Sequence, residues 1–506
     1  MNRNKMLAHL NMQQQFDIVI IGGGATGLGA AVDAAARGYK TLLVEQYDFG
    51  KGTSSRSTKL VHGGVRYLAQ GNIKLVKEAL RERGWLLKNA PQLTTIQPFV
   101  VPVFSWWEKF YYSVGLKAYD LLSGKLSLGN TSLLNKKQTI QHLPAINPKK
   151  LVGGILYYDG QFNDSALCAA LAVTAVKHGA TVLNYTKATG FLKEKEIITG
   201  VDIVDTITGT AYTVKAKAVI NATGVFTDAI LQMDNIDADL LVTPSQGIHL
   251  VVDTRFFPGN NALMIPKTDD GRVLFAVPWL NKVVIGTTDT PVDIIDIEPI
   301  ALEEEIAFII EHINRYTTAA ITRQDIKSVF AGLRPLVRTA GTASTALLSR
   351  DHTLVVAPSK LVTITGGKWT TYRKMAEDAV NNAVFVSKQA RLNECSTRNL
   401  AIGNAAEKKA IIDQLIQADA SLAERLHPNY EFIKAEVVYA CLHEMAMTPE
   451  DFLARRIRLL FLDAAAALEV AEMVTQIMAK TLHKDDNWVA EQLNLFKALA
   501  HPYLLA

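Results

Sequence analysis

The chain has 506 residues, with 53 basic and 49 acidic side chains and a formal net charge of +4. This length is too great for one ordinary hydrophobic core and predicts two or three domains. The near balance of charge gives no support for nucleic-acid binding. Cys168, Cys395 and Cys441 stand alone in the sequence, which argues against a disulfide framework or a metal site and favours a reducing, cytoplasmic compartment.

The first 15 residues are mostly polar and lack the apolar core of a signal peptide. We expect residues 1–15 to be a disordered tail. No stretch reaches the run of about 18 to 20 apolar residues that spanning a bilayer requires, so we expect any membrane contact to be peripheral. The most apolar late segment, residues 459–474, is interrupted by three acidic residues and is predicted to be a packed helix.

A strand, a glycine turn and a helix follow the tail. Residues 18–21 form a continuous β-branched apolar run, typical of a strand covered on both faces of a parallel sheet. Gly22, Gly24 and Gly27 then have the spacing G-x-G-x-x-G. The first glycine makes a tight turn, the second admits a pyrophosphate close to the backbone, and the third lets the helix pack on the strand.

The rest of this unit agrees with a dinucleotide site. A helix over residues 25–37 would present its N-terminal N–H groups to a diphosphate. A second strand over residues 41–45 ends in Glu45, which is placed to accept hydrogen bonds from a ribose. An ordinary solvated strand end is the alternative for Glu45 taken alone.

Residues 48–67 are dense in glycine, hydroxyl and basic side chains. Hydroxyls of Thr53, Ser54 and Ser55 could donate to phosphate oxygens, and Lys59 and His62 add positive charge. Ligands gather at the carboxyl ends of parallel strands, so this position favours a ligand contact over a solvated loop.

A basic amphipathic helix is predicted over residues 73–88, followed by six aromatic residues between 103 and 112. We favour a core or domain contact for these aromatic residues. A membrane-interface role is the alternative, because Trp, Tyr and Lys suit the headgroup boundary.

Further along the chain, an alanine-rich helix capped by Asp164 or Ser165 precedes short strands in hairpin style over residues 181–215. Another buried strand ends at Gly224, where backbone could approach a ligand closely. A strand-rich region over residues 241–288 suggests a mixed or antiparallel sheet, and residues 303–316 are predicted to be a helix.

Residues 361–380 repeat the order of strand, glycine pair and helix, here with Gly366 and Gly367. Only helices are predicted after about residue 390, most clearly over residues 436–446 and 451–462. The basic run 455–458 is interpreted as a solvated or subunit-facing surface.

Six motifs in this order carry a resemblance to a known family: the G-x-G-x-x-G turn, Ser54-Ser55 with residues 59–67, Asn221-Ala-Thr-Gly224, Gly332-Leu-Arg-Pro335, Ser349-Arg-Asp351 and residues 366–373. Together they resemble the aerobic, FAD-dependent glycerol-3-phosphate dehydrogenases, over the chain up to about residue 380. The helical C-terminal part is similar to that family's cap domain. The resemblance implies non-covalent FAD and oxidation of sn-glycerol 3-phosphate to dihydroxyacetone phosphate. It also implies electron transfer to a membrane quinone and attachment to the inner face of the cytoplasmic membrane.

The expected fold class is α/β, with a Rossmann-like FAD-binding domain, an interleaved substrate domain built on a mixed or antiparallel sheet, and an all-α C-terminal cap domain. The expected boundaries are 16–90, 150–240 and 345–390 for the FAD-binding domain, 91–149 and 241–344 for the substrate domain, and 391–506 for the helical domain.

The resemblance also assigns residues to the site. FAD would be held by Gly22, Gly24, Thr26, Gly27, Glu45, Thr53, Ser54, Ser55, Lys59, His62, Gly63, Gly224, Gly366, Gly367, Lys368 and Thr370. The substrate pocket would be lined by Arg66, Tyr67, Arg350 and Lys368, with His249 and Arg334 as the catalytic pair.

The chemistry of these residue types agrees with that assignment. Arginine binds phosphate oxygens through two parallel hydrogen bonds, as a phosphorylated substrate requires. Hydride removal from C2 leaves a hydroxyl proton that a base must take. By its pKa His249 is the natural base, whereas Arg334 would polarise the oxygen on C2.

Three alternatives stay open. An oxidase would return the electrons to oxygen and release hydrogen peroxide from the same pocket. An amine or amino-acid oxidase would share the first motif but would want a carboxylate clamp and an apolar amine pocket. A non-catalytic flavoprotein would bind the flavin without its being reduced by substrate. The sequence leaves a homodimer open.

Overall fold

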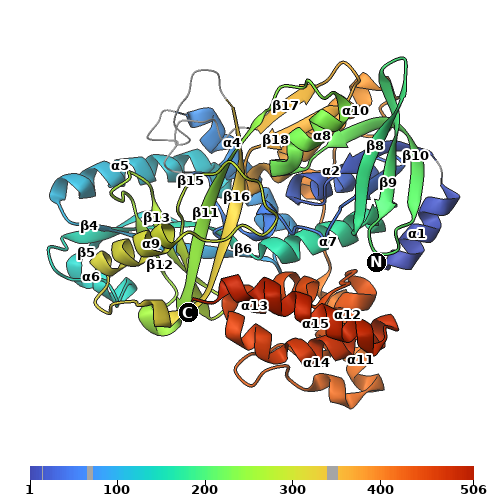
Figure 1. Cartoon of the computed structure of the whole chain (residues 1–506). Coiled ribbons are helices and arrows are strands. Elements are labelled where there is room, and N and C mark those ends of the chain that lie inside the picture. Colours follow the sequence, from blue (N-terminus) through green and yellow to red (C-terminus); the bar gives the residue numbers. More distant parts are fainter. Residues whose placement is uncertain (14, 65–71, 339–351, 506) are drawn as a thin grey trace.

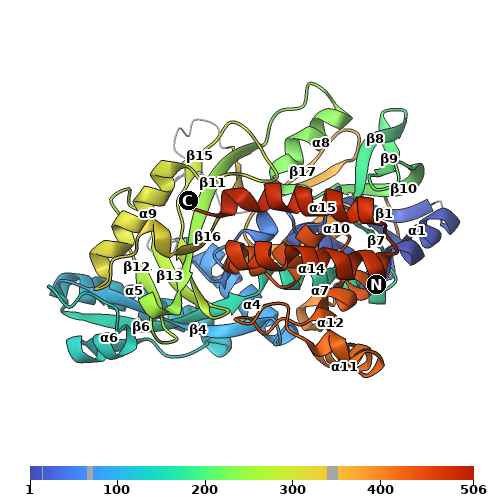
Figure 2. The same cartoon turned by 60° about the horizontal axis from the view of Figure 1, so that its bottom comes forward.

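The structure is a computed structural model that describes residues 1–13, 15–64, 72–338 and 352–505. Two sheets lie side by side, and helices from the last quarter of the chain pack against one part of the second sheet and against α7 (Asp164–Lys177), which covers the first sheet (Figure 1; Figure 2). The α/β class, the second sheet and the helical C-terminal region confirm the predicted fold class.

In the described residues the first sheet has eight strands, and β18, β10, β1, β2 and β7 run parallel to one another in that order. β17 pairs antiparallel with β18, and β9 joins β8 to β10 as an antiparallel extension. The strands are β1 (Gln15–Ile21), β2 (Thr41–Val44), β7 (Thr181–Leu183), β8 (Thr186–Glu194), β9 (Ile197–Asp205), β10 (Ala211–Asn221), β17 (His352–Val356) and β18 (Val362–Gly366).

Strand β1 is buried on both faces of this sheet, as its apolar run predicted. Ile18 and Ile20 point into a core formed with α2, α7 and α10. Val19 and Ile21 point into a second core shared with β8, β9 and the N-terminal helix. The alternation follows from the two-residue period of a strand.

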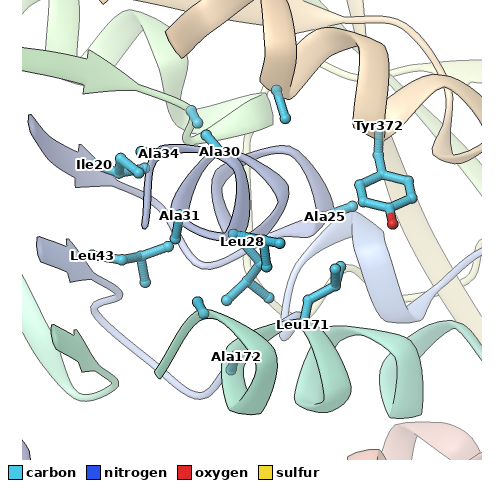
Figure 3. Close-up of a cluster of buried hydrophobic side chains, with 14 of the residues drawn as sticks. Ile20, Ala25, Leu28, Ala30, Ala31, Ala34, Leu43, Leu171, Ala172 and Tyr372 are labelled. Atoms are coloured by element: carbon cyan, nitrogen blue, oxygen red, sulfur yellow. The ribbon is translucent and has the colours of Figure 1, made fainter. Parts of the chain in front are cut away.

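The position of helix α2 explains its alanine content. It lies between the first sheet, α7 and α10, and Figure 3 shows its small side chains packed against Leu43, Leu171 and Tyr372. A Cβ atom added at Gly29 would come within 2.9 Å of the Tyr372 ring. Small residues therefore let three elements approach this helix closely.

The second sheet has ten strands within the described ranges, in the order β15-β11-β14-β13-β12-β4-β6-β3, with β16 paired to β11 and β5 to β6. Its strands are β3 (Leu60–Val61), β4 (Thr94–Val103), β5 (Ser132–Asn135), β6 (Gly153–Phe162), β11 (Val242–Asp253), β12 (Ala262–Ile265), β13 (Leu274–Trp279), β14 (Lys282–Gly286), β15 (Thr290–Pro291) and β16 (Ile326–Val337). β3 and β6 pair within this sheet, although residues 60–61 and 153–162 fall in the segments expected for the FAD-binding domain.

The helices are α1 (Arg3–Met12), α2 (Ala25–Ala36), α4 (Ile73–Asn89), α5 (Trp106–Ser123), α6 (Lys136–His142), α7 (Asp164–Lys177), α8 (Thr227–Asp234), α9 (Glu303–Tyr316), α10 (Tyr372–Val386), α11 (Ala405–Ala418), α12 (Lys434–His443), α13 (Leu459–Leu462), α14 (Ala464–Leu482) and α15 (Asp486–Ala500). Residues Asp451–Arg456 form a π-helical segment, and Asp463 separates α13 from α14. None of the helices in the described ranges is both long and apolar enough to cross a bilayer.

The expected disordered tail is instead a helix that packs on the first sheet. Arg3 is buried and donates to an Asp205 carboxylate oxygen at 3.0 Å and to the Asn184 carbonyl at 3.2 Å. Leu10 lies in the core beneath the sheet. Because these partners are about 200 residues away, the composition of the N-terminus alone could not predict its order.

Four of the six aromatic residues between 104 and 112 contradict the interpretation as core, whereas Phe104 and Tyr112 are partly buried against the cores of the second sheet. Trp106, Trp107 and Phe110 are 74%, 73% and 63% exposed. The buried face of α5 carries Leu116 and Tyr119 instead. The helix therefore presents large apolar side chains to its surroundings.

Candidate cofactor and substrate site

A cavity of about 510 Å³ opens at the carboxyl ends of β1, β2, β10 and β18. The residues that line it come from segments far apart in the sequence: the loop after β1, the loop after β2, the turn after β10, strand β16 and the turn after β18. Ten of the predicted cofactor residues line this cavity: Gly22, Gly24, Thr26, Glu45, Thr53, Ser54, Gly224, Gly366, Gly367 and Lys368.

The glycines of the first turn fit a phosphate group placed close to the backbone. Gly22 has a φ of 110°, and a Cβ there would lie 2.6 Å from the Ala222 carbonyl oxygen. At Gly24 an added Cβ would meet only Ser54 Oγ, at 3.1 Å, so the space above this glycine is open to a ligand. α2 starts at Ala25 and directs its dipole to the same place.

Glu45 lines the cavity directly after β2. Its carboxylate accepts hydrogen bonds from Gly23 N at 2.6 Å and from Tyr47 N at 2.9 Å. Burial raises the pKa of Glu45, and these two N–H donors oppose that rise. The residues present therefore fit the two ends of a dinucleotide, a diphosphate on glycines and a ribose on an acid.

The other predicted cofactor residues are not part of the described cavity lining and contact neighbouring segments. Gly27 lies against the Gly22 carbonyl and lets α2 pack closely. His62 N donates to Thr370 Oγ1 at 3.1 Å, and Gly63 N donates to Tyr119 OH at 2.7 Å. Ser55 is buried, so its hydroxyl bonds the loop backbone.

Lys59 is a buried cation rather than a cavity residue. Its ammonium donates to Asp164 Oδ2 at 2.7 Å and to the Ser55 carbonyl at 2.9 Å. Burial lowers the pKa of Lys59 to about 7, against the opposing effect of Asp164. Asp164 does not cap α7 as predicted, because Asn163 takes that position and Asp164 turns to Lys59.

Asp164 keeps its charge in this interior. Burial would raise its pKa, but the Lys59 and Arg458 cations outweigh burial and lower the pKa of the carboxyl. Asp164 Oδ2 also accepts from Ser57 Oγ at 2.7 Å. Sequence reasoning missed this residue as a partner of the 52–59 segment, because nothing near it in the sequence shows that a lysine 105 residues earlier will face it.

Arg334 projects from β16 beside Pro335, which lines the cavity. Its guanidinium donates to the Gln246 and Thr288 carbonyls, at 3.2 and 2.9 Å, and to Thr287 Oγ1 at 3.1 Å. Gly247 leaves room for it, because an added Cβ there would overlap the guanidinium. The arginine is thus held in one orientation by the sheet.

His249 lies on the same face of the sheet, two residues along β11 from Gly247. Its ring stacks on Phe330, and its Nε2 is 2.9 Å from Thr58 Oγ1. Nδ1 is buried and has no hydrogen-bond partner among the described residues. Burial, with the Lys59 and Arg334 cations, lowers the pKa of His249 well below its usual value, so the imidazole is neutral near pH 7.

Arg334 and His249 therefore lie near each other, beside Thr287 and Gly286 respectively. The described cavity lining includes neither of them. Lys368 lines the cavity at the end of β18. The other predicted substrate residues, Arg66, Tyr67 and Arg350, lie outside the described residues.

Residues 455–458 contradict the predicted solvated surface. Arg455 and Arg458 are almost fully buried, and Arg456 is 8% exposed. Arg455 and Arg456 both donate to Asp48, at 2.6 and 2.7 Å, in the loop that lines the cavity. No local pattern could have identified these contacts, because the acid and the arginines are about 400 residues apart.

Comparison with known protein families agrees with this geometry. Residues 17–373 match the family described as FAD dependent oxidoreductase, and residues 361–489 match the C-terminal domain of alpha-glycerophosphate oxidase. Fold, cavity and family together define an FAD-dependent oxidoreductase with a helical C-terminal domain.

Comparison with individual proteins shows which FAD-dependent oxidoreductases this chain is similar to. The chain is 40% identical to the human mitochondrial glycerol-3-phosphate dehydrogenase, over 97% of this chain and 74% of that protein. A probable mitochondrial glycerol-3-phosphate dehydrogenase from Caenorhabditis elegans is also 40% identical, over 95% of this chain and 72% of that one. The chain belongs to the FAD-dependent glycerol-3-phosphate dehydrogenase family.

Solved structures show the same fold. A glycerol-3-phosphate dehydrogenase from Bacillus halodurans, complexed with FAD, superposes with a TM-score of 0.78 at 29% identity and covers 99% of this chain and 97% of its own. An L-alpha-glycerophosphate oxidase from Mycoplasma pneumoniae with FAD bound superposes with a TM-score of 0.58 over 77% of this chain. At 18% identity, the second likeness shows the fold alone.

Proposed function

We propose that the protein oxidises sn-glycerol 3-phosphate to dihydroxyacetone phosphate and passes the electrons to a membrane quinone. The observation that carries the catalytic part is the pairing of a fixed guanidinium with a neutral, buried imidazole on one face of the second sheet, where Pro335, next to the arginine, lines the cavity. Bound FAD supplies the acceptor for the hydride from C2.

In this proposal Arg334 binds and polarises the oxygen on C2. Its hydrogen bonds to backbone carbonyls and to Thr287 fix its direction before substrate arrives, so little reorganisation is needed during the reaction. His249 accepts the hydroxyl proton at Nδ1, since Nε2 already faces Thr58. The neutral form that burial favours is the form that a base requires.

The phosphate of the substrate requires fixed positive charge. Lys368 lines the cavity at the N-terminal side of α10. We assign Arg66, Tyr67 and Arg350 to the same phosphate on the strength of their motifs, because arginine pairs with phosphate through two hydrogen bonds.

The test is anaerobic mixing of the FAD-loaded protein with glycerol 3-phosphate in a stopped-flow spectrophotometer. The proposal predicts loss of the oxidised flavin absorbance near 450 nm, roughly complete within a second at a typical turnover number. Glycerol without phosphate should bleach the flavin far more slowly. Bleaching by amino acids but not by glycerol 3-phosphate would contradict the proposal and favour the amino-acid oxidase alternative.

The electron acceptor needs a separate experiment, because the same pocket could serve an oxidase. The curated relatives named above are dehydrogenases, whereas the C-terminal family takes its name from an oxidase. We predict that the reduced protein reoxidises rapidly with a short-chain quinone and slowly with oxygen. Stoichiometric peroxide in air-saturated buffer, with no quinone reduction, would favour the oxidase.

Electron transfer to a membrane quinone requires that the protein contact lipid, and we propose that α5 makes this contact. We define the α5 face as Trp107, Phe110, Val114 and Leu121, which share one side of the helix by their spacing of three, four and seven residues. All four are more than half exposed. Contiguous exposed apolar side chains on one helix indicate a binding surface.

Positive charge borders this face. Lys109 Nζ donates to the Leu134 carbonyl at 3.0 Å, which brings the start of α6, with exposed Lys136 and Lys137, beside the start of α5. Trp and Lys together suit the headgroup region of an anionic bilayer. We therefore propose peripheral attachment of the α5 face to the inner, anionic side of the cytoplasmic membrane.

Cosedimentation with phosphatidylglycerol vesicles tests this attachment. Replacing Trp107 and Phe110 by Ser should lower vesicle affinity about ten-fold or more, because each large apolar side chain contributes on the order of 1.5–3 kcal/mol when buried. Phe385→Ser is the matched control, since that side chain is 80% exposed on another helix. Equal loss in both variants, or loss in neither, would contradict the proposal.

A further inference from the structure

The C-terminal helices contact the loop over residues 45–56, which follows β2 and lines the cavity. The cavity lining includes Tyr47, Gly50 and Ser54 from this loop. Within the described residues, few backbone hydrogen bonds tie the loop to its neighbours, among them Gly50 N to the Gly23 carbonyl at 2.9 Å. Side-chain bonds join it to β16 and to the turn after β18: Thr53 Oγ1 donates to the Leu333 carbonyl at 2.6 Å, and Trp369 Nε1 donates to the Ser54 carbonyl at 2.7 Å. The conformation of the loop therefore depends on what else holds it.

Asp48, at the turn of this loop, has no exposure and faces two arginines of the C-terminal segment. Arg456 binds it with two parallel hydrogen bonds, Nη1 to Oδ2 at 2.7 Å and Nη2 to Oδ1 at 2.8 Å. Arg455 Nε adds a third hydrogen bond to Oδ2, at 2.6 Å. This fork geometry fixes direction as well as distance.

A third arginine of the C-terminal segment holds the far end of the loop. Arg458 donates from Nη2 to the Ser55 carbonyl at 2.6 Å. Its backbone adopts the left-handed region, with a φ of 67°, which is unusual for a residue with a side chain. A further ion pair joins Lys51 of the loop to Glu450 at 2.8 Å.

Stability alone is a weak reason for such an arrangement. Burying several charges costs desolvation energy, and well-packed apolar residues often stabilise a fold as well or better. Buried charges with fork geometry instead restrict the loop to one conformation, because each hydrogen bond is lost when the loop moves. The restricted segment is the one that borders the cofactor cavity.

We propose that Arg455, Arg456 and Arg458 are positioning residues of the cofactor site: from the C-terminal helical domain they hold the 45–56 loop in the conformation that binds FAD. The C-terminal domain is then part of the cofactor site although none of its described residues lines the cavity. FAD affinity depends on its docking, through the hydrogen bonds to Asp48 and to the Ser55 carbonyl.

The test uses the full chain with Arg456 replaced by Gln or by Lys. FAD affinity is measured by the quenching of added flavin fluorescence. Hydrogen exchange of the FAD-free protein then reports on the loop itself. We expect the dissociation constant of FAD to rise about ten-fold or more in Arg456→Gln and by a smaller factor in Arg456→Lys, which keeps the charge but loses the fork.

Amide exchange should accelerate over residues 45–56 and stay unchanged over α14, whose core does not involve the loop. Lys177→Met is the matched control. Lys177 pairs with Glu407 across the same two domains, but both side chains are about half exposed, so FAD binding should not change.

Unchanged FAD affinity in Arg456→Gln would overturn the proposal. Faster exchange spread equally over residues 45–56 and α14 would overturn it as well, because it would show general destabilisation rather than loop positioning. If Arg456→Gln does not fold, Arg456→Lys decides by the same two criteria.

Discussion

Replacing Gly22 or Gly24 of the dinucleotide turn by Ala should have two different effects. Gly22→Ala should lower stability, and Gly24→Ala should weaken FAD binding. Gly22 has a φ of 110°, and its added Cβ would lie 2.6 Å from the Ala222 carbonyl oxygen and 2.9 Å from the Ala222 carbonyl carbon. An unfavourable φ costs about 1–3 kcal/mol, and overpacking against backbone costs about 1–3 kcal/mol more. Gly22→Ala should therefore lower the stability of the FAD-free protein by about 2–6 kcal/mol.

Gly24→Ala should spare stability and damage binding. Gly24 has extended backbone, with φ −80° and ψ −177°, and its added Cβ meets only Ser54 Oγ, at 3.1 Å. The expected loss of stability is within about 1 kcal/mol. The methyl group would occupy space beside the cavity, so the dissociation constant of FAD should rise about ten-fold or more.

Urea unfolding of the FAD-free protein and fluorescence titration with FAD separate the two effects. Gly115→Ala is the control, because Gly115 lies inside α5 with nothing within 4 Å of its added Cβ. The free energy of unfolding of this variant should rise by up to about 1 kcal/mol. Wild-type stability in Gly22→Ala, or wild-type FAD affinity in Gly24→Ala, would refute the assignment of these two roles.

Four further substitutions test the site and its surroundings. Arg334→Lys and His249→Asn should each slow anaerobic flavin reduction by glycerol 3-phosphate about 100-fold or more at normal FAD content; near-normal rates would contradict the catalytic pair. Asp164→Asn should lower the free energy of unfolding by about 3–5 kcal/mol in a urea titration, because it leaves Lys59 buried without its counter-charge; a loss below about 1 kcal/mol would show that the ion pair is not needed. Burial would raise the pKa of Asp48, but Arg456 and Arg455 lower this pKa from 3.8 to about 2. The contribution of the Asp48 carboxylate to stability is therefore present above pH 4 and is lost as the pH falls toward 2. Asp48→Asn should therefore be less stable than wild type by roughly 2 kcal/mol at pH 6 and should approach it at pH 2; a pH-independent difference would refute this sign.

Local patterns predicted the parts of the fold that depend on neighbouring residues. The apolar run before Gly22 gave the buried strand, and glycine spacing gave the start of α2, because backbone geometry and side-chain period act within a few residues. Glu45 and Gly366 were placed at the cavity for the same reason, since each ends a parallel strand of one sheet.

Contacts between distant segments could not be predicted in this way. Arg456 and Asp48 are separated by 408 residues, and a run of arginines in a helix has the same composition whether it faces water or an acid. The exposed face of α5 was only the alternative prediction, because apolar residues at helical spacing usually face a core.

Anaerobic titration of the FAD-loaded protein with glycerol 3-phosphate, followed in the visible spectrum, tests the central claim most directly. The account predicts that the oxidised flavin absorbance disappears and that one dihydroxyacetone phosphate forms for each flavin reduced. The Arg334→Lys protein should keep its flavin colour on the same timescale. A flavin spectrum indifferent to glycerol 3-phosphate in the wild-type protein would contradict the account.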